Sequence, residues 1–243
     1  MLLLPVKNFA NAKQRLGSVL DSAERRKLAQ AMLEDVLQAL RSWTQRPPVA
    51  VVTSAVSARR LARSFSFDVI EDPANEGETE AIALGTRVCA ARGAPYSLVI
   101  PGDIPLVEPS ELQAIVAAAP DATGGSVLVP ATDERGTNAA LRKPAGLFPL
   151  TFGEYSFQPH LRAARATGQP CVVLRLPGVE LDVDTPADLA LLIAAETRTR
   201  TQKLLRDWHV RQRLEGWEKA PSSPQWHRDS ENRNNRKGGA RNA

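Results

Sequence analysis

Acidic side chains follow predicted strands at two places that lie far apart in the sequence. In VIPGDIPLV, residues 99–107, Asp103 comes just after an apolar run that a Pro-Gly pair ends. In LDVDTP, Asp182 and Asp184 share one face of an extended segment. Carboxylates at the ligand-binding edge of an α/β sheet can hold Mg²⁺, whose other ligands are waters and substrate phosphates. We therefore predict a Mg²⁺ site at Asp103 with Asp182 or Asp184; a turn aspartate and a helix N-cap are the simpler alternatives.

Three cations gather in KNFANAKQRL, the segment that leaves the first predicted strand. Lys7, Lys13 and Arg15 are suited to bind a phosphate chain, because fixed positive charges attract it and arginine makes bidentate contacts. A solvated basic loop is the alternative for this segment.

A loop and a helix start follow the strand predicted at 67–70. Gly77 loosens this loop, and Thr79 is predicted to cap the helix that continues to residue 91. A helix N-terminus beside a strand end is a natural site for a nucleotide base or ribose, so we expect Gly77 and Thr79 to contact one.

The glycine-punctuated stretch 131–157 interrupts the regular pattern of strands and helices. We interpret it as a small β excursion that forms a rim over the sheet. Thr137, Asn138, Gly153 and Ser156 supply hydroxyl, amide and backbone donors there. An ordinary hairpin with turn residues is the alternative.

Strands and helices alternate along most of the chain, which predicts an α/β fold with a mostly parallel sheet and right-handed crossovers. The apolar runs predict strands at 1–6, 49–53, 67–70, 97–100, 127–130 and 171–176. Helical spacing predicts helices at 22–46, 56–64, 79–91, 109–118, 157–167 and from 185 onwards. The helix at 109–118 is expected to be capped by Ser110.

Composition limits the classes of protein that this chain can belong to. Its 243 residues are 43% hydrophobic, which is enough for a sizeable core. Two cysteines, Cys89 and Cys171, are too few for a disulfide framework or a cysteine-based zinc site and fit a reducing cytoplasm. The start lacks the basic segment of a signal peptide, and no window approaches 18 apolar residues.

The net charge of +4 is distributed unevenly. Residues 198–243 hold 12 Lys and Arg against 5 Asp and Glu, whereas residues 1–197 hold 19 against 22. The body is therefore mildly acidic, and its charge does not support binding of nucleic acid. We predict a body at 1–197 and a basic tail at 198–243 that is partly helical and then disordered.

Three tryptophans recur in this tail at intervals of nine residues, at positions 208, 217 and 226. A solvated tail is the default expectation for such a polar, charged chain end. Stacking of the tryptophans on bases, docking on the body, or docking on a second subunit in a homodimer are the alternatives.

Several motifs, taken in order, resemble one known family. They are LLLPVKNFANAKQRL, VIPGDIPLV, GTNAAL, FGEYSF and DVDTPADL. Together they are similar to the 2-phospho-L-lactate guanylyltransferase family of coenzyme F-420 biosynthesis, within the MobA-like nucleotidyltransferases. The resemblance covers residues 1–197 and implies a three-layer, Rossmann-like fold of the nucleotide-diphospho-sugar transferase type. After Gly77 this chain carries Glu-Thr-Glu, where relatives have a Leu-Asn-Ala-like run.

The resemblance also implies substrates and roles. GTP donates GMP to the phosphate of a three-carbon acid, which is 2-phospho-L-lactate, phosphoenolpyruvate or 3-phospho-D-glycerate, and diphosphate leaves. Lys13 and Arg15 would contact the triphosphate, and Asp103 with Asp182 or Asp184 would hold Mg²⁺. The residues implied to bind the acid are Thr137, Gly153 and Ser156.

Two other functions remain as alternatives. The first is another MobA-like transferase, which acts on molybdopterin or a sugar phosphate; a glycine-rich first loop would favour molybdopterin, and residues 7–15 contain no glycine. The second is a nucleic-acid-binding or scaffold protein that acts through the basic tail. A GTP turnover assay on a chain that ends near Thr197 would separate these readings from the predicted enzyme.

Overall fold

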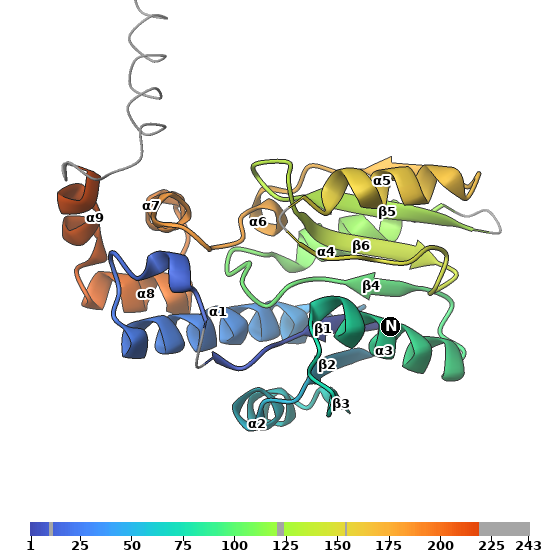
Figure 1. Cartoon of the computed structure of the whole chain (residues 1–243), viewed down its shortest axis with the longest axis horizontal. Coiled ribbons are helices and arrows are strands. Elements are labelled where there is room, and N and C mark those ends of the chain that lie inside the picture. The colour runs from blue at the N-terminus through green and yellow to red at the C-terminus, as the bar shows by residue number, and fades with distance from the viewer. Residues whose placement is uncertain (10–11, 121–123, 154, 219–243) are drawn as a thin grey trace, which may run out of the picture.

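A seven-stranded sheet forms the centre of the computed structural model, which describes residues 1–9, 12–120, 124–153 and 155–218 (Figure 1). The strand order is β3-β2-β1-β4-β6-β5-β7, and only β6 runs antiparallel to its neighbours within this sheet. In chain order the strands are β1 (Leu2–Pro5), β2 (Val49–Thr53), β3 (Asp68–Glu71), β4 (Ser97–Val99), β5 (Gly125–Pro130), β6 (Thr137–Lys143) and β7 (Cys171–Val173). The predicted α/β class with a mostly parallel sheet is confirmed.

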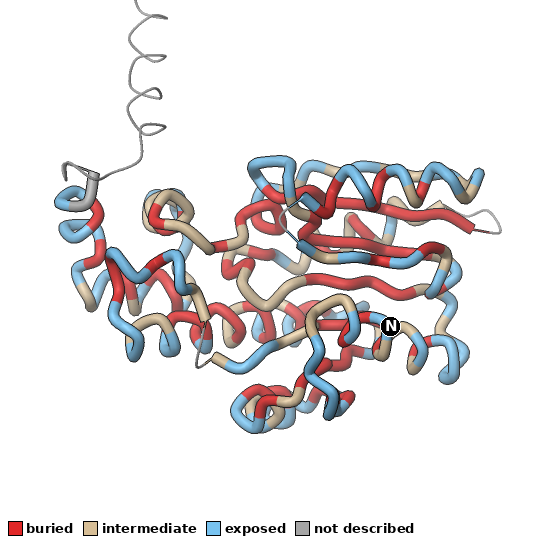
Figure 2. The backbone as a smooth tube through the Cα atoms, in the orientation of Figure 1, coloured by how far each residue is buried: buried red, intermediate tan, exposed pale blue. Residues whose placement is uncertain are grey.

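Helices cover both faces of this sheet. They are α1 (Ser22–Ser42), α2 (Val56–Ser64), α3 (Glu78–Ala91), α4 (Pro109–Ala117), α5 (Phe157–Ala166), α6 (Pro177–Glu180), α7 (Pro186–Ala194), α8 (Arg200–Asp207) and α9 (Val210–Glu218), with a short 3₁₀ helix at Gln14–Leu16. Leu2 and Leu4 of β1 pack into one core with α1, α2 and α4, whereas Leu3 packs into a second core with α3 and α5. The two cores make the predicted three-layer arrangement, and Figure 2 shows buried backbone along most of the sheet.

Local sequence explains most of these elements. Strands β1, β2, β4 and β5 are mostly apolar and buried at nearly every position, because helices cover both sides of the sheet. The capping box of Asp21 and Glu24 starts α1, and Thr185 with Asp188 starts α7. Two predicted caps are wrong. Gly77 precedes α3, where Thr79 already lies inside the first turn, and the capping box of α4 is built on Glu108 rather than on Ser110.

The β excursion enters the main sheet instead of forming only a rim above it. Strand β6 lies between β4 and β5, with Ala140 opposite Val99 on one side and Leu128 on the other. The segment after β6 then covers the α3 and α5 side, where Phe148 and Leu150 join the second core. Because β6 is central, its first residues are brought to the end of the sheet that also holds Asp103.

The alternating pattern predicted a strand that ends at Asp182 and Asp184, and this prediction is wrong, because residues 181–184 are not a strand of the sheet. This segment follows α6, and the Val183 N–H donates a hydrogen bond to the Asp103 carbonyl oxygen at 3.1 Å. Leu181 and Val183 are buried, so the alternation still turns both carboxylates to the other side. One backbone hydrogen bond thus brings the two acidic segments together.

Helices α8 and α9 follow residue 197; α8 packs against α1, and α9 packs against α7 and α8 (Figure 1). The Asp35 carboxylate accepts hydrogen bonds from the backbone N–H groups of Arg200 and Thr201, and Arg213 forms an ion pair with Glu24. The boundary at residue 197 remains a prediction, and the predicted disordered tail after 218, with Trp226, lies outside the described residues.

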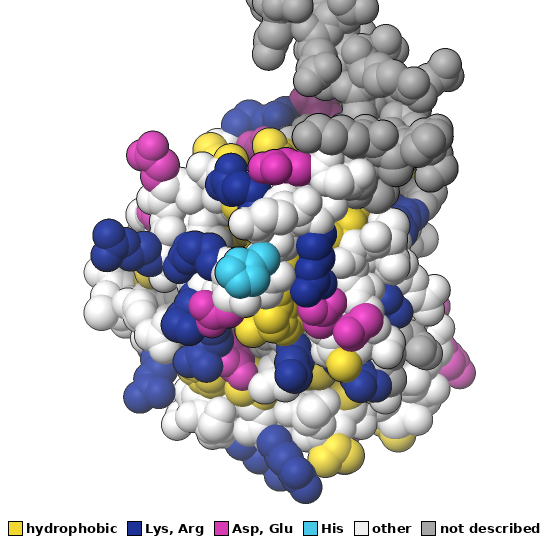
Figure 3. Space-filling model, turned by 90° about the vertical axis from the view of Figure 1, so that its left-hand side faces the viewer, with side chains coloured by type: hydrophobic (Ala, Val, Ile, Leu, Met, Phe, Trp, Pro, Cys, Tyr) yellow, Lys and Arg dark blue, Asp and Glu magenta, His cyan; other side chains and the backbone are white. Residues whose placement is uncertain are grey.

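Many Lys and Arg side chains gather on the face of the molecule at the α8 and α9 end (Figure 3). Five of them line a groove between α1 and α8 of about 680 Å³, namely Lys27, Arg198, Arg200, Lys203 and Arg206. The predicted site residues do not line this groove. None of the described helices combines the length and the apolar character needed to cross a lipid bilayer.

Candidate active site

Two cavities meet at the carboxyl ends of β1 and β4, which is where ligands bind in open α/β sheets. The α3 cavity, of about 640 Å³, is lined by Lys7, Gly77 and other residues of the β1, β3 and α3 ends. The β6 cavity, of about 850 Å³, is lined by residues near the start of β6 and by the loops around it. Asp103 and Asp184 line both cavities and form part of the wall that they share.

The Lys13 ammonium joins two of the predicted carboxylates. Its Nζ lies 2.5 Å from Asp103 Oδ2 and 2.6 Å from Asp184 Oδ1, and only 7% of its side chain is exposed. Burial alone would lower the pKa of this ammonium, but the two carboxylates outweigh burial and raise it. Lys13 is therefore held as a cation at the junction of the two cavities.

Further carboxyl groups crowd this junction. Burial, and then the negative charge of Asp103, raise the pKa of Asp182 to about 6 and the pKa of Glu78 to about 7. Asp182 Oδ1 accepts a hydrogen bond from Asn138 Nδ2 at 3.0 Å, which opposes part of that rise. The site thus carries more negative charge than Lys13 alone neutralises.

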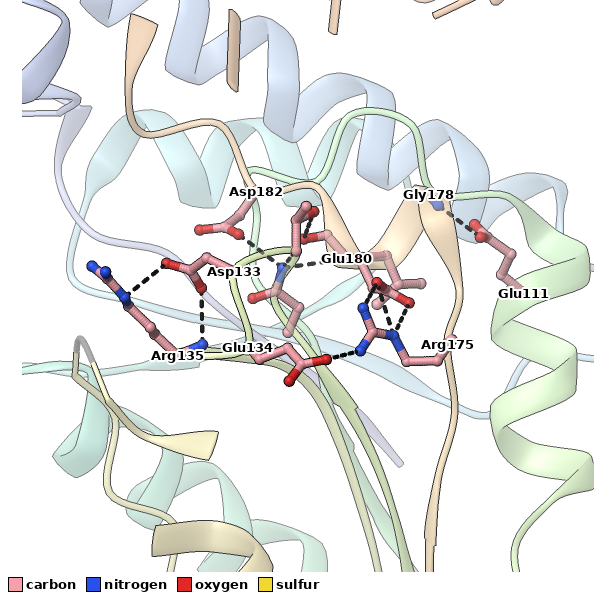
Figure 4. Close-up of polar contacts among 11 residues, drawn as sticks. Glu111, Asp133, Glu134, Arg135, Arg175, Gly178, Glu180 and Asp182 are labelled. Atoms are coloured by element: carbon pink, nitrogen blue, oxygen red, sulfur yellow. Dashed lines mark hydrogen bonds and ion pairs between the residues drawn. The ribbon is translucent and has the colours of Figure 1, made fainter. Parts of the chain in front are cut away.

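A network of ion pairs and hydrogen bonds holds the segment that leads to Asp182 (Figure 4). The Arg175 guanidinium donates to the Glu180 carboxylate at 2.8–3.1 Å and also to Glu134. The Glu180 carbonyl oxygen in turn accepts from Thr132 N–H at 2.9 Å and from Asn138 Nδ2 at 2.9 Å. These contacts tie the loop between β5 and β6 to the segment that leads to Asp182.

The donor set fits a hard divalent cation. Asp103 Oδ1 is buried and has no hydrogen-bond partner among the described residues, and such an oxygen costs free energy unless something binds it. Asp182 and Asp184 add carboxylate oxygens in the same cavity. Within the described residues, however, no group of three or more His, Cys, Asp or Glu is spaced as a complete metal site, and Lys13 lies between Asp103 and Asp184.

The residues predicted to bind the acid come together in the β6 cavity. Ser156 Oγ accepts from Thr137 N–H at 3.1 Å, and the Gly153 carbonyl oxygen accepts from Ser156 N–H at 3.2 Å. A Cβ added at Gly153 would have no neighbour within 4 Å, so its backbone faces open space. Arg15 lines the same cavity.

The residues predicted to bind the nucleotide are only partly brought together. Lys7, Lys13 and Gly77 line the α3 cavity. Thr79 is not among the residues that line either cavity, and its Oγ1 instead accepts a hydrogen bond from Phe152 N–H at 3.0 Å. Thr79 thereby connects the start of α3 to the segment that carries Gly153.

Asn138, which the sequence predicted as an amide donor of this stretch, donates to Asp182 Oδ1. Sequence reasoning missed two other residues of this site. His160 contacts Thr137 Oγ1 through its Nδ1 at 2.9 Å, although a single histidine on a helix carries no functional signal by itself. Glu78 was noted only as a departure from the family pattern, yet it lines both cavities.

Known proteins provide an independent comparison. The family model described as "Guanylyl transferase CofC like" matches residues 1–218. The chain belongs to this family. A phosphoenolpyruvate guanylyltransferase from Conexibacter woesei is 35% identical over 213 residues, which cover 84% of this chain and 96% of that protein. A 3-phospho-D-glycerate guanylyltransferase from Phenylobacterium zucineum is 31% identical over 224 residues, which cover 88% and 98%.

A solved structure agrees with the fold of this CofC-like chain. A Desulfovibrio desulfuricans protein described as a nucleotide-diphospho-sugar transferase superimposes with a TM-score of 0.71 at 20% identity, over 87% of this chain and 96% of that one. The predicted family, the nucleotide-diphospho-sugar transferase fold and the class of enzyme, a guanylyltransferase, are confirmed. The roles of individual site residues remain predictions.

Proposed function

We propose that this CofC-like protein transfers GMP from GTP to the phosphate of a three-carbon phospho acid, as a step in coenzyme F-420 biosynthesis. We favour 3-phospho-D-glycerate or phosphoenolpyruvate as the acid, with 2-phospho-L-lactate as the third candidate. The observation that carries the proposal is the wall shared by the two cavities, where Lys13 joins Asp103 and Asp184. A nucleotide in one cavity and an acid in the other would meet at this wall.

The reaction needs no protein nucleophile. An oxygen of the acceptor phosphate attacks the α-phosphorus of GTP, and the bond from that phosphorus to the oxygen bridging to the β-phosphate breaks. The leaving diphosphate keeps the electron pair of that bond. Catalysis then depends on alignment and on neutralising the charge of the phosphates.

Lys13, Arg15 and Lys7 supply the fixed positive charges in this proposal. Lys13 lies at the meeting point, whereas Lys7 lines the α3 cavity and Arg15 lines the β6 cavity. Gly77 is the remaining candidate for nucleotide contact. Thr79 would contribute indirectly, because its hydroxyl holds the segment around Phe152 in place. Thr137, Gly153 and Ser156 would hold the acid.

Asp103, with Asp182 or Asp184, is the proposed Mg²⁺ site, since Asp103 presents an unpartnered buried oxygen. A bound Mg²⁺ would supply positive charge to the phosphate oxygens. For the metal to bind Asp103 and Asp184, Lys13 would have to share these carboxylates with it.

We also propose that the reaction takes place in the cytoplasm, because Cys89 and Cys171 are both free thiols. A homodimer remains a prediction that size-exclusion chromatography with light scattering would test. GTP and the phospho acid are the partners on which the assay below depends.

The test is diphosphate release from GTP with Mg²⁺ and each of the three acids separately. We expect turnover with at least one acid and none when the acid is omitted. CTP in place of GTP is the control for the nucleotide. Absence of diphosphate release with all three acids would contradict the proposal.

Asp103→Asn tests the site within this assay. Loss of the charge should lower kcat at least about 100-fold, because the metal and Lys13 both depend on this carboxylate. Asp207→Asn, the same change at an exposed residue of α8 far from both cavities, should leave kcat within about twofold. Near wild-type turnover of a folded Asp103→Asn variant would refute the assignment of Asp103.

A further inference from the structure

His160 is buried on α5 and both of its ring nitrogens have a partner. Nδ1 lies 2.9 Å from Thr137 Oγ1, and Nε2 accepts a hydrogen bond from the Thr151 backbone N–H at 2.9 Å. Only 1% of the residue is exposed. The Phe152 ring packs edge-on against the imidazole, with the two ring centroids 5.1 Å apart. The ring is therefore held in one orientation.

The Thr151 contact determines the tautomer. A backbone N–H can only donate, so Nε2 must be unprotonated. Burial, and then the positive charge of Arg142, lower the pKa of the ring to about 4, so it is neutral near neutral pH. A neutral ring without hydrogen on Nε2 carries it on Nδ1, and Nδ1 donates this hydrogen to Thr137 Oγ1.

This donation decides what the Thr137 hydroxyl can do. Because its oxygen accepts from His160, its own hydrogen must point to another group. Ser156 Oγ accepts from Thr137 N–H at 3.1 Å and donates to Thr137 Oγ1 at 3.5 Å, at the limit of a hydrogen bond, so Ser156 does not take up the Thr137 hydrogen. Thr137 and Ser156 both line the β6 cavity, so the Thr137 hydrogen is available there.

We propose that His160 is a positioning residue that keeps the Thr137 hydroxyl as a hydrogen-bond donor toward an anionic oxygen of the substrate in the β6 cavity. This inference rests on the proposed function, in which that cavity holds the phospho acid. With the opposite tautomer the imidazole would take up the Thr137 hydrogen, and an oxygen lone pair would face the anion instead. His160 thus sets the affinity for the acid without touching it.

Two substitutions separate the two halves of the histidine contact. In His160→Asn the amide nitrogen lies near the place of Nδ1 and can still donate to Thr137. In His160→Gln the longer side chain places an acceptor near Nε2, so the Thr151 contact can remain while the donor to Thr137 is lost. We expect His160→Gln to raise the KM for the acid about tenfold above that of the wild-type protein. We expect His160→Asn to keep the KM for the acid close to the wild-type value.

The KM for GTP and the thermal midpoint control for a general structural effect. The KM for GTP should change less than about twofold in both variants, because the α3 cavity is not in contact with His160. Thr137→Val should raise the KM for the acid as much as His160→Gln does. Adding His160→Gln to Thr137→Val should then have no further effect, because the hydroxyl that His160 orients is already absent.

Several results would overturn the proposal. Equal KM values for the acid in the Asn and Gln variants, or full additivity with Thr137→Val, would show that His160 does not act through Thr137. If both variants fail to fold, ¹⁵N chemical shifts of the His160 ring in the wild-type protein report the tautomer directly. A hydrogen on Nε2 would refute the proposal. Failure of the wild-type protein to turn over GTP with any acid refutes the proposed function instead, and this inference with it.

Discussion

Glu78 provides the sharpest test of the electrostatics of this site. It is the first residue of α3, it is half-buried, and it faces both cavities. Burial and the charge of Asp103 raise the pKa of its carboxyl to about 7, although Lys7 and Lys13 oppose the rise. We predict that Glu78→Gln stabilises the fold at pH 8 and has little effect at pH 4.5.

The sign and size follow from linkage between protonation and folding. A carboxyl whose pKa rises from 4.5 to about 7 favours the folded state while it is protonated, and this stability is lost as the pH rises from 4.5 through 7. The full shift corresponds to about 3 kcal/mol at 1.36 kcal/mol per pKa unit. Water screens part of this for a half-buried group, so we expect Glu78→Gln to gain about 1–2 kcal/mol at pH 8.

Urea unfolding of both proteins at pH 4.5 and pH 8 measures this difference. EDTA keeps metal ions from changing the charge at Asp103 during the experiment. Glu80→Gln is the matched control, at an exposed position two residues after Glu78 on α3, and should change the free energy of unfolding by less than about 0.5 kcal/mol. A stability difference for Glu78→Gln that is the same at both pH values, or a less stable variant at pH 8, would refute the reasoning.

Two further predictions concern how the site is supported. Asp35 accepts from the N–H groups of Arg200 and Thr201 and from the Thr201 hydroxyl at 2.6–2.9 Å, so Asp35→Ala should lower the free energy of unfolding by about 1–2 kcal/mol in urea titrations. An unchanged value would show that α8 does not depend on this cap. Gly178→Ala would place a Cβ 2.3 Å from Glu111 Oε2, so we expect a thermal midpoint lower by several degrees; an unchanged midpoint would contradict the close packing of α6 on α4.

Local sequence patterns predicted the class of fold and most of its strands and helices. Apolar runs predicted β1, β2, β4 and β5, because a strand that helices cover on both faces is mostly apolar. Capping residues such as Thr185 marked helix starts, since they satisfy backbone groups only a few residues away. Asp103, Asp182 and Asp184 could be proposed together because each ends a segment that leads to the same edge of the sheet.

The contacts among these residues depend on the folded chain. Lys13 contacts Asp103 across 90 residues of sequence and Asp184 across 171, and no local pattern specifies such a pairing. The insertion of β6 between β4 and β5 has the same origin, because strand order depends on long-range packing. The role of His160 depends on two partners, Thr137 and Thr151, that fold onto it from other elements. Local sequence therefore determines where a segment turns, whereas the position of a charge or a hydrogen depends on neighbours that only the folded chain brings within reach.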